Sequence, residues 1–87
     1  MTNGERVGQV IHFFDKIGVA ILRLSKDLKI GDHLHFHGAH TDFEETVSSM
    51  QVEHQPVEEV KAGGEVALKV TQKAREGDAV YRLPEQV

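Results

Sequence analysis

A row of histidines is the feature of this sequence that is best suited to chemistry. Four histidines lie in the short segment HLHFHGAH, namely His33, His35, His37 and His40. Side chains alternate between the two faces of a strand, so the first three share one face. Imidazoles on one face can bind zinc or nickel together. The row gives the hypothesis of a metal-binding protein with these four ligands. The alternative is a solvated face, on which any metal binding is adventitious.

No other arrangement of side chains predicts catalysis. The sequence has no cysteine, which excludes a thiol nucleophile, a thiolate metal site and a disulfide framework. No serine lies in a GxSxG motif. The carboxylates of Glu44-Glu45 and Glu58-Glu59 are adjacent, so on a strand they face opposite ways and cannot form an acid/base pair. We therefore expect no enzyme activity and no resident cofactor.

A basic and aromatic group gives a second candidate surface. The cationic residues Lys16, Arg23, Lys26 and Lys29 are expected around one end of the strand at residues 19–24, with Phe13 and Phe14 nearby. Phosphate contacts and base stacking on such residues suit single-stranded RNA. The formal net charge is -4, from 14 acidic and 10 basic residues, which argues against binding duplex nucleic acid through the overall field. The alternative interpretation of these residues is an ordinary solvated surface.

Strands, and no helix, are expected to position these residues. Runs of β-branched and aromatic residues, separated by turns rich in Gly and Asp, predict strands at 7–14, 19–24, 33–37, 43–54, 65–70 and 79–83. The apolar phase of the fourth strand switches between Val47 and Met50, which predicts a β-bulge at Ser48-Ser49. Six short strands favour a small closed six-stranded antiparallel β-barrel, because closure removes exposed edges.

The chain of 87 residues is expected to form a single domain, 1–87, with an ordered core over about 7–83. The longest apolar run is far shorter than the ~20 residues that span a bilayer. The first residues have no apolar signal core. We therefore expect a cytoplasmic protein with no membrane partner.

Several stretches resemble translation factors. The segment IGVAILRLSKDLKIGDHLHFHG, with the later pieces KAGGEVALKV and REGDAVYRL, resembles the second domain of elongation factor Tu. The stretch HFHGAHTDFEETVSSMQVEH, followed by PVEE, resembles stand-alone translation elongation factor-like proteins. The resemblance implies a translation-protein barrel that binds RNA, either tRNA or ribosome-associated RNA, or a translation-machinery protein. It implies no nucleoside triphosphate site, because the chain lacks GxxxxGK[ST].

The same resemblance adds one residue and one alternative. It aligns Gln51 with a glutamate in a strand of the factor that contacts tRNA, so Gln51 joins the RNA-binding candidates. The barrel also resembles the C-terminal domain of collagenase-like peptidases, which implies an accessory subunit of a separately encoded enzyme. The first hypothesis is thus a non-catalytic RNA-binding or translation-associated module. The alternatives are the metal-binding protein and the accessory subunit. The oligomeric state is not predicted.

Overall fold

The computed structural model describes residues 4–84, and every regular element in this range is a β-strand. The strands are β1 Glu5–Phe14, β2 Val19–Leu24, β3 Leu28–Lys29, β4 His33–His37, β5 Asp42–Thr46, β6 Met50–Val52, β7 Gln55–Val57, β8 Glu59–Val60, β9 Glu65–Lys69 and β10 Ala79–Arg82. The all-β prediction is confirmed. Over the same residues, no helix has the length and apolar content needed to cross a membrane.

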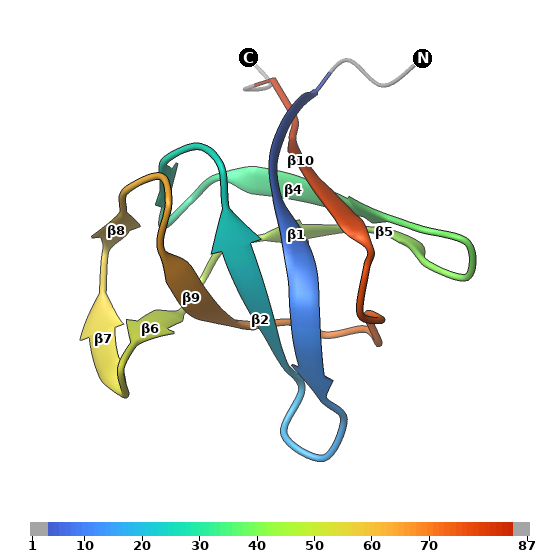
Figure 1. Cartoon of the computed structure of the whole chain (residues 1–87), viewed down its shortest axis with the longest axis horizontal. Coiled ribbons are helices and arrows are strands. Elements are labelled where there is room, and N and C mark those ends of the chain that lie inside the picture. The colour runs from blue at the N-terminus through green and yellow to red at the C-terminus, as the bar shows by residue number, and fades with distance from the viewer. Residues whose placement is uncertain (1–3, 85–87) are drawn as a thin grey trace.

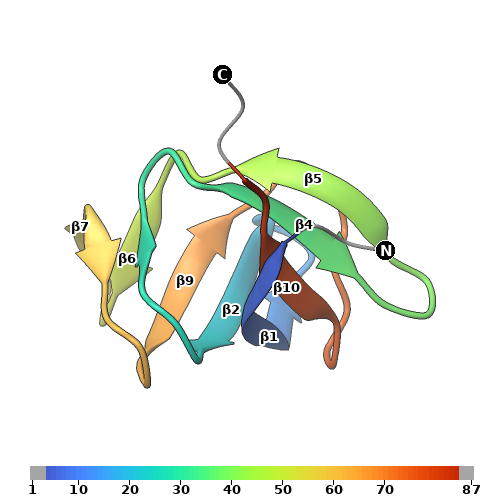
Figure 2. The same cartoon turned by 90° about the horizontal axis from the view of Figure 1, so that it is seen from above.

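Eight of the strands form one curled antiparallel sheet. Their order across it is β5-β4-β10-β1-β2-β9-β6-β7, while β3 and β8 form a separate two-stranded sheet. Figures 1 and 2 show the large sheet wrapping around one interior. Its outermost strands, β5 and β7, do not pair with each other within residues 4–84. The architecture is therefore an open half-barrel.

The prediction of a closed six-stranded barrel is wrong in both closure and strand number. The single strand expected over 43–54 is divided into β5 and β6, with residues 47–49 outside regular structure. Both Val47 and Met50 are 1% exposed, so the chain needs a longer break than one bulged residue to bury both. After β6 the chain reverses into β7, where Pro56 lies on the edge strand. Proline cannot donate a ladder hydrogen bond and is suited to an edge.

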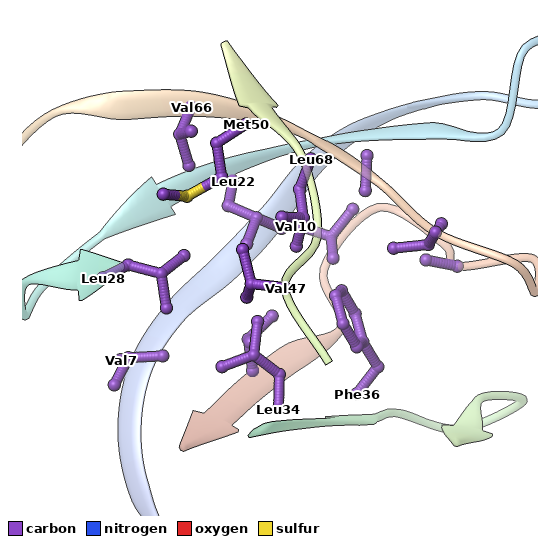
Figure 3. Close-up of a cluster of buried hydrophobic side chains, with 14 of the residues drawn as sticks. Val7, Val10, Leu22, Leu28, Leu34, Phe36, Val47, Met50, Val66 and Leu68 are labelled. Atoms are coloured by element: carbon purple, nitrogen blue, oxygen red, sulfur yellow. The ribbon is translucent and has the colours of Figure 1, made fainter. Parts of the chain in front are cut away.

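One hydrophobic core fills the inside of the curl (Figure 3). Strict alternation in β2, β4 and β9 turns Leu22, Leu34 and Leu68 inward, and none of the three is exposed. The rings of Phe36 and Phe43 stack with their centroids 4.8 Å apart. The buried hydrophobic residues are Val7, Val10, Ala20, Leu22, Leu24, Leu28, Leu34, Phe36, Phe43, Val47, Met50, Val60, Val66, Leu68, Val70, Ala74 and Val80. The alternate residues of these strands form the outer faces of the sheet.

The same four-residue turn precedes both β4 and β10. In KIGD (29–32) and REGD (75–78) the third residue is a glycine, with φ of 95° and 93° respectively. Glycine adopts positive φ without steric cost, because it has no Cβ atom. The backbone N–H of the first residue donates to the aspartate, over 3.0 Å from Lys29 to Asp32 and 2.7 Å from Arg75 to Asp78. These turns fix where the histidine strand β4 and its neighbour β10 begin.

Candidate binding surfaces

The histidine row lies on the outer face of β4, beside the edge strand β5. The antiparallel register places His33 opposite Thr46 and His37 opposite Asp42. His33 Nδ1 lies 3.0 Å from Thr46 Oγ1, and His35 Nε2 lies 2.6 Å from Asp42 Oδ1. The hydrogen bond from His35 lowers the pKa of the Asp42 carboxyl group. Two of the histidines therefore already have a side-chain partner on the neighbouring strand.

The four histidines are not gathered around one point. The rings of His35 and His37 meet edge to face with their centroids 5.6 Å apart, while His40 lies in the exposed turn after β4. Within residues 4–84, no three His, Asp or Glu side chains are placed to share one metal ion. A zinc site needs its ligand atoms about 2.0–2.2 Å from the metal. The metal hypothesis for His33, His35, His37 and His40 gains no support from this geometry.

The predicted RNA-binding residues are dispersed over the molecule. Phe13, Phe14 and Lys16 belong to the β1–β2 hairpin end. The other three cations, Arg23, Lys26 and Lys29, follow at the far end of β2, and Gln51 lies on β6. The Arg23 guanidinium is 3.4 Å from a Glu65 carboxylate oxygen, and Phe13 packs against the core. The expectation that the basic residues surround one end of β2 is wrong, because this six-residue strand separates Lys16 from the other three.

An ionic cluster around Arg82, at the end of β10, escaped the sequence analysis. Its guanidinium donates to Glu5 Oε1 at 3.1 Å, to the Asp27 backbone oxygen at 2.7 Å and to Asp32 Oδ2 at 3.3 Å. Hydrogen bonding with Glu5 raises the pKa of Arg82 and lowers that of Glu5. The partners are 77, 55 and 50 residues from Arg82, so no local pattern could reveal them. The cluster ties β1 and β10 to the loops around β3 and borders a hollow of about 870 Å³.

A second, smaller groove lies between the β6–β7 hairpin and β9. Figure 1 shows these strands together at one side of the sheet, away from the described ends of the chain. The groove has a volume of about 540 Å³. Its lining residues are Ile21, Gln51, Val52, Glu53, His54, Val60, Gly64, Glu65, Val66 and Ala67. They include apolar side chains and two carboxylates, but neither lysine nor arginine.

The groove exists because the ladder between β6 and β9 stops early. Gln51 opposite Ala67 is its last pair, although β9 already begins at Glu65. Strand β6 instead turns back into β7 through Glu53 and His54, whose φ values are 52° and 65°. Two successive residues with positive φ form the tight hairpin turn that usually carries Asn-Gly. Neither the early stop nor the unusual turn residues gave a signal that sequence reasoning could use.

The polar side chains of residues 4–84 form separate contacts and do not assemble a nucleophile. His12 is 3.3 Å from a Glu76 oxygen, while the His33–Thr46 and His35–Asp42 contacts are separate pairs. In nucleophilic hydrolases, hydrogen bonds link a hydroxyl or thiol to a base and link that base to an orienting group. No such hydrogen-bonded chain occurs in the part of the protein that the structure describes.

Comparison with known proteins identifies a protease relative. The chain is 44% identical over 82 residues to an uncharacterized protease from Methanocaldococcus jannaschii. The match covers 93% of this chain and 20% of that protein, so the chain spans about a fifth of the curated relative's length. No family model matches the sequence.

Solved structures with the same fold come from a peptidase as well. Two crystal structures of the C-terminal domain of a candidate U32 peptidase from Geobacillus thermoleovorans, one of them the selenomethionine variant, superpose on this protein. The variant has a TM-score of 0.84 and 18% identity, covering 88% of this chain and 98% of that one. The other has a TM-score of 0.86 and 17% identity, covering 92% and 93%. At this identity the likeness shows the fold alone.

These findings correct the expectation of a translation elongation factor-like protein. The sequence relative is a protease and the structural neighbours are peptidase domains, so the assignment to translation and RNA binding is wrong. The physical reason lies in the motifs that carried the resemblance. The Lys-x-Gly-Asp and Arg-x-Gly-Asp turns fix where strands begin, as the structure shows, and a shared fold does not imply a shared ligand.

Proposed function

We propose that this protein is a non-catalytic accessory module of a U32-type peptidase, which binds polypeptide for a catalytic part that lies elsewhere. The observation that carries the proposal is the 44% identity over 82 residues to a protein named as a protease. The half-barrel likeness to the C-terminal domain of a candidate U32 peptidase supports it. The accessory-subunit hypothesis, which was an alternative in the sequence analysis, therefore replaces the translation hypothesis.

The size of the match supports an accessory role over a catalytic one. The matched region is 20% of the relative, so most of that protein lies outside it. In this chain His33, His35 and His12 form isolated pairs with Thr46, Asp42 and Glu76 respectively, and these pairs provide no activated nucleophile. The proposal places the module in the cytoplasm.

Calorimetry tests the proposal without depending on activity. The M. jannaschii relative, with its matched region removed, is titrated with the 87-residue protein. We expect saturable one-to-one binding, with a Kd on the order of 1 μM. The intact relative is the control, because its own region occupies the position and should exclude the added protein. Absence of binding to the truncated relative, or equal binding to both forms, contradicts the accessory role.

A further inference from the structure

We propose that the groove between the β6–β7 hairpin and β9 binds an extended segment of the peptidase's polypeptide substrate. The segment would place an apolar side chain on the groove floor and an adjacent lysine or arginine beside Glu53. The source of the segment rests on the proposed function above. The chemistry of recognition rests on the groove itself and has three components, namely an apolar floor, an unpaired strand edge and an unpaired carboxylate.

The floor is apolar although it belongs to the outer face of the sheet. Ile21 pairs with Ala67, and Ala67 pairs with Gln51, so these three side chains stand in one row on the same face. Ile21 and Ala67 are only half-buried, and they are not part of the core. Val52, which packs partly against the core, also lines the groove. A peptide's apolar side chain would remove this surface from water, which favours binding.

The strand edge beside the floor is open to backbone pairing. On one side β9 pairs with β2 as far as Glu65, opposite Arg23. On the other side its ladder with β6 ends at Ala67, so Glu65 and Val66 have no strand partner there among residues 4–84. An extended peptide can add to such an edge through main-chain hydrogen bonds, which give affinity, while side-chain pockets give specificity.

The negative charge of the groove lining favours a cationic residue in the peptide, next to its apolar residue. The groove carries Glu53 and Glu65, but no lysine or arginine. Arg23 pairs with Glu65 at 3.4 Å, whereas Glu53 has no ion-pair partner in the described range. Glu53 is therefore the carboxylate that remains for a ligand cation. A peptide with an apolar residue followed by lysine or arginine matches both the floor and this charge.

A titration of the ¹⁵N-labelled 87-residue protein tests the inference. The probe is the capped peptide Ser-Gly-Leu-Lys-Gly-Ser, compared with forms in which Ser replaces Leu or Glu replaces Lys. We expect saturating amide shifts around Gln51, Glu53 and Ala67, with a Kd on the order of 1 mM or tighter. Each altered peptide should bind about tenfold more weakly. Shifts that map elsewhere, fail to saturate, or are equal for all three peptides overturn the inference.

Exposed substitutions locate the site without disturbing the core. Glu53→Lys and Gln51→Lys both place a cation in the groove, and both positions are exposed. Each should weaken binding of the Leu-Lys peptide about tenfold. Glu44→Lys makes the same charge change as Glu53→Lys at an exposed position of β5, outside the groove, and should leave the affinity unchanged. Equal affinity of Glu53→Lys and Glu44→Lys overturns the proposed site.

Competition separates this inference from the proposed function. If the truncated relative displaces the peptide, the groove is an interface with the enzyme and the substrate assignment is wrong. If the peptide binds but the truncated relative does not, the proposed function fails while the groove chemistry stands. If the truncated relative binds and the peptide does not, only the inference about the groove fails.

Discussion

Two outer faces of the sheet rest on one core, one formed by β4 and β5 and the other by β6, β7 and β9. They differ in the contacts that their side chains make. On the first face, His33 and His35 contact Thr46 and Asp42 on the adjacent strand. On the second face the sheet ladder stops early, and Glu53 stands beside an apolar groove without an ion-pair partner within the described residues. The two faces therefore differ in their most evident feature, which is a row of histidines on the first and an apolar groove beside an unpaired strand edge on the second.

Substitutions in the core should have the largest effect, and they test whether the two faces rest on the same hydrophobic core. Leu34 lies beneath the histidine face and Leu68 beneath the groove, and both are fully buried. Leu34→Ala and Leu68→Ala should each lower the free energy of unfolding by about 2–5 kcal/mol, because each deletes core atoms and leaves a cavity. Urea denaturation measures both. A loss below about 1 kcal/mol for either variant would mean that its face does not rest on the common core.

A smaller effect is expected at the hairpin turn beside the groove. Glu53 adopts φ of 52°, and asparagine tolerates this conformation better than glutamate does. Glu53→Asn should therefore raise the free energy of unfolding by about 0.5–1 kcal/mol. It should also weaken binding of the Leu-Lys peptide, since it removes the carboxylate. Thermal melts and the same peptide titration give the two values. A variant that gains stability and keeps full affinity would show that Glu53 has no role in binding.

The histidine face should show a still smaller, pH-dependent effect. The hydrogen bond from His35 lowers the pKa of Asp42 in the folded state. A lowered folded pKa means that this contribution to stability is present above the ordinary carboxyl pKa, about 4, and is lost as the pH falls through the folded value. Asp42→Asn should therefore flatten the dependence of stability on pH below about 4. Urea melts from pH 2 to 6 check this, with Glu44→Gln on the same strand as control. An unchanged slope in Asp42→Asn contradicts the assignment.

The smallest effect concerns metal. Because the described histidines are not arranged around one metal position, adding a chelator to untagged protein should leave the melting temperature unchanged. Elemental analysis of the same sample checks the metal content. About one zinc or nickel per chain, together with a lower melting temperature after chelation, would reverse the comparison and make the histidine face the functional one.

Local patterns predicted most of the fold because local physics determines it. Strands 19–24 and 33–37 follow from apolar alternation, and the glycines at 31 and 77 supply the positive φ that their turns need. Closure could not be predicted in this way. It depends on how the chain buries Val47 and Met50 together while Ser48 and Ser49 stay exposed, which is a tertiary outcome.

The candidate sites were less predictable than the fold. The Arg82 cluster joins residues from both ends of the chain, and no periodicity encodes such a contact. The groove depends on the register at which β6 leaves β9 and on Glu53-His54 forming a turn that usually carries Asn-Gly. The histidine row was conspicuous because residue types are visible in a sequence, whereas the partners that satisfy them are not.

The most direct test grafts this protein into its relative. The 87-residue chain replaces the matched region of the M. jannaschii protease, in three forms that carry no substitution, Glu53→Lys or Glu44→Lys. Hydrolysis of denatured casein is compared with hydrolysis of a short peptide. The account predicts that the unsubstituted and Glu44→Lys chimeras hydrolyse casein at the same rate. The Glu53→Lys chimera should hydrolyse casein about tenfold more slowly and the short peptide at an unchanged rate. Equal casein hydrolysis by all three chimeras would contradict the claim that this module recruits polypeptide through the groove.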